Sequence, residues 1–289
     1  SKPPPPRGND RAAVKYTRQL AKDLVVSVTP WVGTTVISFR GDRDEEEADG
    51  SPTRNVVFRR PVYPWGTRID AVRDETWGHL RAGVDFQGGY LGVTTVTGFN
   101  RDEGEGPETI FTSRTWNDIG VWGELRYAPS DKWSVKPGLR LDYYDLTGEF
   151  VADPRINLHQ VVTQDLTLRQ AFGVFHQEPA PTELDTPFAE QKVDSSTTYQ
   201  SSVGAELQLP QEITASLVAF WHESRGLPVR SDEDRNILRS DGMSPALFEI
   251  VLEYVGDGSY RRNLGKGRSI GLEFMARRQV GRWFSFISY

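Results

Sequence analysis

The sequence contains no cysteine and few histidines, which removes several kinds of chemistry at once. With no cysteine among its 289 residues, a disulfide scaffold, a thiolate zinc site and a cysteine nucleophile are all excluded. The four histidines are scattered, and no pair has the spacing of metal ligands: His79, His159, His176 and His222. We therefore expect no metal site and no cofactor.

Long apolar runs and an excess of positive charge are also lacking. No stretch of about 18 uncharged apolar residues is present, so the sequence predicts no transmembrane helix. The net charge is −6 and the pI is about 5.4, which excludes a broadly basic surface and argues against a nucleic-acid partner. The sequence is rich instead in glycine and aromatic residues, with 27 Gly, 14 Phe, 10 Tyr and 8 Trp.

Apolar and polar residues alternate over long segments. From Trp133 to Tyr143 the odd positions are mostly apolar and the even positions mostly polar, and the same period recurs from Tyr199 to Leu209. A period of two indicates β-strands with one apolar and one polar face. These strands approach the length of about 9–11 residues that crosses a bilayer. We predict sequential antiparallel strands over 119–128, 133–146, 154–163, 166–176, 198–209 and 213–223.

The connections between these segments alternate between short and long. Short turns are predicted at 21–23, 87–89, 129–131, 164–165, 210–212 and 280–281, and longer polar links at 40–66, 100–112, 147–153, 177–197 and 225–258. About twelve strands result, with the long links 40–66, 177–197 and 225–258 expected at one end of the sheet. Outer-membrane β-barrels show this asymmetry, with short periplasmic turns and long extracellular loops.

The two faces of such a barrel would have different roles. Apolar residues are expected to face lipid: Val135, Leu139, Leu141, Val203, Ala205 and Leu207. Charged residues on the other face are candidates for the lumen: Glu124, Arg126, Lys136, Arg140, Arg155, Arg169, Glu206 and Glu273. A solvated face without a dedicated partner remains open as an alternative for this second group.

The long links supply a second group of candidates. Residues expected in extracellular loops, where a ligand would first bind, are Trp65, Glu183, Arg230 and Tyr254. The acidic run 41–50 has no Ca²⁺-loop spacing and is interpreted as a hydrated loop tip. Ser244-Pro245 and the apolar residues that follow predict a short helix over 245–254. That helix would either pack the longest loop or cover a binding site.

Several motifs in order carry a family resemblance. WSVKPGLRLDYY over 133–144 precedes DPRINL over 153–158, and LRQAFGVF over 168–175 precedes EPAPTEL over 178–184. The strand 199–209 and NLGKGRSIGLE over 263–273 follow, with Ser288-Tyr289 beyond them. This order resembles the barrel of TonB-dependent outer-membrane receptors over about 119–289, and only its topology over 1–118.

The resemblance implies an all-β, antiparallel transmembrane β-barrel in the bacterial outer membrane. Family barrels have 22 strands, so about twelve strands imply that 1–289 form a partial barrel, completed by further barrel segments or complex subunits. The family's plug domain and TonB-box peptide are not recognised in these residues.

The resemblance also implies a function, which is binding and gating rather than enzymatic catalysis. A scarce nutrient, such as a metal chelate, vitamin or glycan, would bind at the extracellular loops and enter with energy from TonB. The implied partners are the lipid bilayer with its lipopolysaccharide, the TonB system acting through a plug, and the extracellular ligand. In the lumen, Glu206 and Glu273 would contact plug arginines.

Two alternatives from other classes remain open at this stage. The first is an outer-membrane structural or surface-recognition barrel that transports nothing. The second is an outer-membrane hydrolase, in which His159 would act with a Ser or Asp on an adjacent strand. An upstream plug sequence with a TonB box would favour transport over both.

Overall fold

The computed structural model describes residues 8–42, 55–97, 108–179, 185–186, 189–190, 193–230 and 261–289. All regular structure in this part of the chain is β-strand. Among the described residues no helix is long and apolar enough to cross a membrane. The all-β fold expected from the sequence is confirmed.

Fifteen strands are formed in the described residues. Their bounds are β1 Gly8–Ala13, β2 Tyr16–Ala21, β3 Leu24–Asp42, β4 Asn55–Glu75, β5 Gly78–Thr97, β6 Glu108–Ser130, β7 Trp133–Tyr144, β8 Glu149–Val161, β9 Leu166–Gln177, β10 Asp185–Thr186, β11 Ala189–Glu190, β12 Ser196–Leu209, β13 Ile213–Arg230, β14 Arg261–Val280 and β15 Trp283–Ser288. Strands of 12 to 23 residues form β3–β9 and β12–β14. The six strands predicted over 119–223 are all present.

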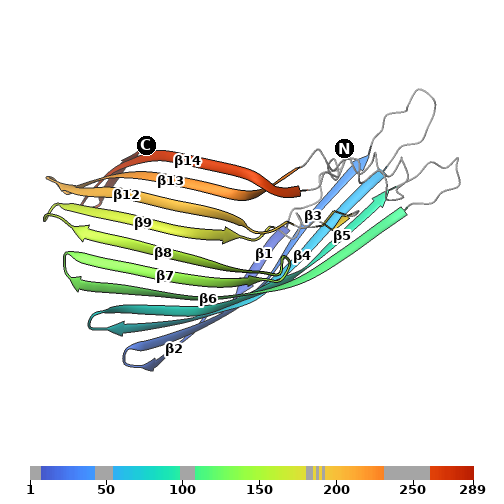
Figure 1. Ribbon diagram of the computed structural model, residues 1–289, viewed down its shortest axis with the longest axis horizontal. Helices are drawn as coiled ribbons and strands as arrows, with labels where there is room; N and C mark the ends of the chain where they lie inside the picture. Colours follow the sequence, from blue (N-terminus) through green and yellow to red (C-terminus); the bar gives the residue numbers. More distant parts are fainter. Residues whose placement is uncertain are drawn as a thin grey trace.

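The strands pair as an antiparallel meander. Thirteen of them form one open sheet in the order β1-β3-β4-β5-β6-β7-β8-β9-β12-β13-β14-β15, with β2 also pairing with β3. Because β1 and β2 lie along different parts of β3, the sheet has twelve strand positions, in agreement with the predicted number. Figure 1 shows this sheet as a strongly curved and twisted wall whose short hairpin turns gather at one end. We call the end of the strands where these turns lie the turn end, and the opposite end of the strands the loop end.

One predicted turn is wrong. Gln87–Gly89 lies inside β5, and the chain reverses instead at 76–77, between β4 and β5. The glycines there serve close packing: a Cβ at Gly88 would lie 2.6 Å from the carbonyl oxygen of Trp116, and one at Gly89 would overlap the Trp116 ring. A glycine pair in a strand therefore marks close approach here rather than a turn.

Two predicted long links are shorter than expected. Strand β4 begins at Asn55, so Trp65 is a strand residue, paired with Val32 and Gly88, and not a loop residue. The link 147–153 is mostly strand β8, joined to β7 by a four-residue turn that ends at Gly148, with φ of 69°. Glycine tolerates this left-handed conformation, which is why so short a turn suffices.

The strands have one apolar and one charged face, as the alternation predicted. Leu139 and Val203 are 47% and 51% exposed on the apolar face. On the charged face, side chains from strands two positions apart meet, as Asp85 of β5 and Arg140 of β7 do across β6. Convergence of this kind is expected on the inner side of a curved sheet.

A small apolar cluster lies on the charged face toward the loop end. Leu91 and Trp116 are buried there, with Val62 and Leu146 packed against them. Outer-membrane barrels carry belts of aromatic residues at both membrane surfaces, but Trp116 lies in the buried cluster on the charged face. Tyr127 and Trp133 near the turn end, and Tyr143 and Phe150 near the loop end, are exposed on the apolar face, where such a belt would lie.

Candidate functional site

A buried carboxylate organises the centre of the charged face. Glu124 of β6 is only 8% exposed, and three cations converge on it. The Lys136 ammonium lies 2.8 Å away, Arg155 donates to Oε2 at 3.2 Å, and Arg81 lies 3.7 Å from Oε1. One negative charge thus serves three positive ones on three different strands, which leaves an excess of positive charge.

A second network extends from the first toward β4. Arg68 donates from Nε and Nη2 to the two oxygens of Asp85, at 2.6 and 3.0 Å. Arg140 bonds to Asp85 and also donates to Asp142, at 2.7 Å from Nε. Bidentate Arg–carboxylate pairs of this kind are geometrically specific. The middle of the wall is therefore a fixed lattice of charges rather than a set of independent surface groups.

Carboxyl groups gather at the loop end of the same face. Asp118 is 3% exposed and accepts a hydrogen bond from the backbone N–H of Asp145 at 3.0 Å. Glu178, which follows β9, is hydrogen-bonded to Asp118, and burial with that neighbouring carboxyl raises the pKa of Glu178 to about 8. At neutral pH Glu178 is therefore largely protonated and donates its proton toward Asp118.

Further polar contacts tie β8, β9 and the start of β12 together near this end. Asp153 accepts from both the backbone N–H and Nδ1 of His176, at 3.1 and 2.6 Å. Glu149 accepts from the backbone N–H of Ser195 at 2.7 Å and from its hydroxyl at 3.2 Å. These contacts hold Ser195, just before β12, and the end of β9 against β8.

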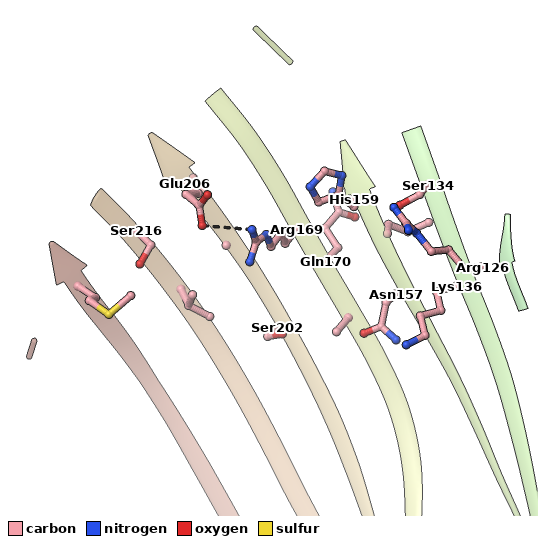
Figure 2. A pocket seen from close by; sticks show the side chains of 16 residues that line it. Arg126, Ser134, Lys136, Asn157, His159, Arg169, Gln170, Ser202, Glu206 and Ser216 are labelled. Carbon is pink, nitrogen blue, oxygen red and sulfur yellow. Dashed lines mark ion pairs between the residues drawn. The ribbon is translucent and has the colours of Figure 1, made fainter. Parts of the chain in front are cut away.

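A pocket of about 460 Å³ lies on the turn-end half of the charged face. Figure 2 shows the labelled side chains of Arg126, Lys136, His159 and Arg169 around it, with Glu206 paired to Arg169. Ser134, Asn157, Ser202 and Ser216 supply further polar groups. A neighbouring polar pocket of about 470 Å³ lies toward β4, bounded by Arg68, Arg81, Trp122, Arg140 and Arg155.

The structure brings most of the predicted lumen residues together. Seven of the eight lie in the networks or the pocket just described: Glu124, Arg126, Lys136, Arg140, Arg155, Arg169 and Glu206. Glu273 of β14 is exposed on the same face, in register with Val218 of β13. Sequence reasoning missed Asp85 and Arg81, because the misplaced turn at 87–89 hid the period-two pattern of β5. It missed Arg68 of β4 because the reversal between β4 and β5 was not predicted.

The predicted loop residues fare differently. Trp65 belongs to β4, and Arg230 is the last residue of β13, paired through its backbone with Arg261. Glu183, Tyr254, the helix predicted over 245–254 and most of the acidic run 41–50 lie outside the described residues. Their role in ligand binding stays a prediction.

The described residues around His159 are not joined as a Ser-His-carboxylate triad. Ser134 lies directly opposite His159 in the β7–β8 register. Within the part of the chain that the structure describes, His159 forms no hydrogen bond with Ser134 or with a carboxylate. A catalytic histidine needs a carboxylate or similar group to orient it toward its nucleophile. The described residues also hold no group of three or more His, Asp or Glu side chains placed to bind a metal ion.

The meander of long strands, one face apolar and the other charged, defines part of the wall of an outer-membrane β-barrel. The family model for the TonB-dependent receptor-like β-barrel matches residues 4–289. The chain therefore belongs to the TonB-dependent receptor β-barrel family, a family of outer-membrane transport proteins. The resemblance seen in the sequence motifs is confirmed, and it extends over the N-terminal strands as well.

Solved structures show the same fold at low sequence identity. The copper transporter OprC matches with a TM-score of 0.69 and 14% identity, over 97% of this chain and 45% of its own. The ferric yersiniabactin uptake receptor FyuA from Yersinia pestis matches with a TM-score of 0.68 and 10% identity, over 97% of this chain and 42% of its own. The ferric citrate transporter FecA matches with a TM-score of 0.57 and 12% identity, over 93% of this chain and 39% of its own.

The chain thus spans less than half the length of each of these structures. A comparison with curated protein sequences gives no match.

Proposed function

We propose that this chain is part of an outer-membrane receptor that takes up a scarce nutrient with energy supplied through TonB. The observation that carries the proposal is the family match over 4–289. The charged face supports it, because a barrel that encloses a gated lumen needs a polar interior that is fixed in shape. Barrels of the size found in outer-membrane transporters have a plugged lumen, and the Glu124 network would line one.

Each proposed partner is assigned to one face of the sheet or to the loops at one end of its strands. The apolar face contacts the bilayer, with lipopolysaccharide at its outer leaflet, and the charged face contacts a plug through which TonB acts. The long loops, including 231–260, meet the ligand outside the cell, because loops carry specificity on rigid scaffolds. Barrel segments beyond this chain complete the wall, since an open sheet edge is not stable in lipid.

Within this function we propose a metal chelate as the nutrient. Three of the structural neighbours are named for the uptake of copper, ferric yersiniabactin and ferric citrate. None of these three names refers to a vitamin or a glycan. The chemistry of the chain is then binding and gating, with no covalent step. Glu183 and Tyr254 remain the proposed loop contacts to this ligand.

The test is loop deletion in the full-length gene product, expressed in its natural outer membrane. Deleting 231–256 should abolish uptake of radiolabelled chelates while leaving surface abundance nearly normal, because loops tolerate deletion better than strands. The probes are ferric citrate, ferric yersiniabactin and a copper salt, with thiamine as a metal-free vitamin and a maltooligosaccharide as a glycan. Replacing the β7–β8 turn residue Thr147 with alanine is the control, since it alters the same end of the sheet without removing a long loop.

Each outcome has a defined meaning. Loss of uptake of one metal chelate with normal abundance supports both transport and the chelate class. Uptake of thiamine or the oligosaccharide instead would overturn the chelate class alone. No uptake of any probe by the intact protein, with normal abundance, would favour a barrel that does not transport.

A further inference from the structure

The turn-end pocket on the charged face carries an unbalanced positive charge. We call it the turn-side pocket; it is lined by the cationic side chains of Arg126, Lys136 and Arg169 and by the imidazole of His159. They come from β6, β7, β8 and β9, and Figure 2 shows them arranged around the hollow. The only carboxylate among its lining residues is Glu206 of β12.

The two carboxylates that contact the cations of the turn-side pocket, Glu206 and Glu124, are already engaged. Glu206 pairs with Arg169 at 3.2 Å. Lys136 shares Glu124 with Arg155 and Arg81, so that carboxylate cannot balance it fully. The side chains of Arg126 and His159 form no hydrogen bond or ion pair with any residue that the structure describes. Five Arg and Lys side chains thus face two carboxylates, before any protonation of His159.

The remaining lining suits an anion that accepts hydrogen bonds. Ser134, Ser202, Ser216 and Asn157 provide hydroxyl and amide donors beside the cations. Carboxylate oxygens accept from such donors and pair best with guanidinium groups. Like charges held together on a wall that closes around a lumen repel each other unless a counter-charge is brought in.

The dimensions favour an extended polypeptide over a single small anion. From β6 to β12 the pocket crosses five neighbouring strands, and a spacing of about 4.8 Å per strand gives a width of about 19 Å. The cations are distributed over most of that width. Several carboxylates on one chain segment match this distribution, whereas one small carboxylate would reach only a part of it.

We propose that the turn-side pocket docks an acidic segment, carrying several Asp or Glu side chains, of the domain that fills the lumen. This polarity is opposite to the expectation that wall glutamates, Glu206 and Glu273, contact arginines of a plug. Glu206 is occupied by Arg169, and the charged lining side chain without a partner among the described residues is a cation, Arg126. The proposal rests on the proposed function in one respect: that a gating domain occupies the lumen.

Two adjacent serines of β12 provide a matched pair for the test. Ser202 lines the turn-side pocket, whereas Ser201 lies on the opposite face, beside Phe172, Trp221 and Ile270. A photo-crosslinking benzophenone amino acid is placed at either position in the full-length protein in its natural outer membrane. Illumination without added ligand should join position 202 to a polypeptide segment that contains Asp or Glu within a few residues of the crosslink. Position 201 should capture no such segment.

Charge variants then test the cause of docking. Arg126→Gln with His159→Gln should reduce the crosslink yield at position 202 several-fold. Lys132→Gln, which removes a cation in the β6–β7 turn outside the pocket, should leave the yield unchanged. A second crosslinking site at Ser216 of β13 guards against a Ser202 variant that fails to assemble.

Three results would overturn the proposal: a captured segment without acidic residues, no captured segment from either 202 or 216 in assembled protein, or a yield unaffected by the double variant. Because no ligand is added, the crosslinking result does not depend on which nutrient is taken up. A failed uptake assay therefore leaves this proposal standing, and a failed crosslink leaves transport standing.

Discussion

Glu124 shows how one residue holds a whole region of the wall in place. Replacing Glu124 with glutamine should leave Lys136, Arg155 and Arg81 without their shared counter-charge. These cations are 37–50% exposed, so water screens part of the effect, and we expect a loss of about 1–2 kcal/mol rather than the larger value for fully buried pairs.

The measurement for Glu124→Gln is the temperature at which the folded band disappears in a semi-native gel of the full-length protein. Glu273→Gln is the matched control, because Glu273 is an exposed carboxylate on the same face. It has no ion pair within the described part of the chain. Equal melting temperatures for the two variants would contradict the role given to Glu124.

Glu178 makes the loop end sensitive to pH. Its pKa is raised from 4.5 to about 8 by burial and by Asp118, so the folded state binds this proton more tightly than the unfolded state. The stabilising contribution is complete below about pH 4.5 and is lost as the pH rises through about 8. The protection factors of the amides in the β7–β8 turn, which are corrected for the intrinsic rise of exchange with pH, should therefore fall between these values, and Glu178→Gln should remove the fall. If the Glu178→Gln variant kept the wild-type pH profile, the pH dependence could not be assigned to Glu178.

For single residues, the sequence predicted which side chains lie on the same face of the sheet, but not which of them form ion pairs with one another. Alternation placed Glu124, Lys136 and Arg155 on one face, and they lie there. That Lys136 and Arg155 share the carboxylate of Glu124 depends on the cross-strand register, in which Glu124 pairs with Gly138 and Gly138 with Arg155. Register follows from turn lengths and side-chain packing together, which a period-two pattern does not contain.

Among the strands, glycines decide where aromatic side chains lie across the charged face. A Cβ on Gly83 of β5 would lie 2.6 Å from the carbonyl oxygen of Ile69 and 2.7 Å from the Trp122 ring. Because the carbonyl belongs to the paired strand, it cannot move aside easily. Gly83→Ala should destabilise the barrel by about 1–3 kcal/mol through overpacking.

Gly123 is the control for this prediction, since its Cβ would meet nothing nearer than 4.0 Å. Gly123→Ala should change stability by less than about 0.5 kcal/mol. Both variants are compared by the same gel assay. If Gly83→Ala proved as harmless as Gly123→Ala, the close approach of β4, β5 and Trp122 would be wrong.

The wrong prediction of a turn at 87–89 also results from close packing at glycines. Gly88 and Gly89 suggested a turn by composition, yet they permit Trp65 and Trp116 to lie close to β5. The true reversal at 76–77 carries no proline and has a single glycine just after it, at Gly78. Long, strongly alternating strands such as β7 and β12 were predictable, whereas strand ends near glycine pairs were not.

For the molecule as a whole, the apolar face must be compatible with lipid. Leu139→Arg, on that face, should impair assembly by about 2–4 kcal/mol if its site lies near the bilayer midplane. Gln208→Arg, near the turn end of the charged face, should be tolerated, because its neighbours Glu206 and Thr214 are polar. Surface abundance in the outer membrane is the measurement. Equal tolerance at both positions would argue against a wall exposed to lipid.

The central claim is that this wall belongs to a TonB-energised transporter, and TonB dependence of uptake tests it most directly. Cells expressing the full-length protein are supplied with limiting radiolabelled ferric citrate, ferric yersiniabactin or copper, with and without a functional TonB. The account predicts saturable uptake of one of these probes that is lost without TonB, while surface abundance and binding at the cell surface persist. Uptake that proceeds equally well without TonB would contradict it.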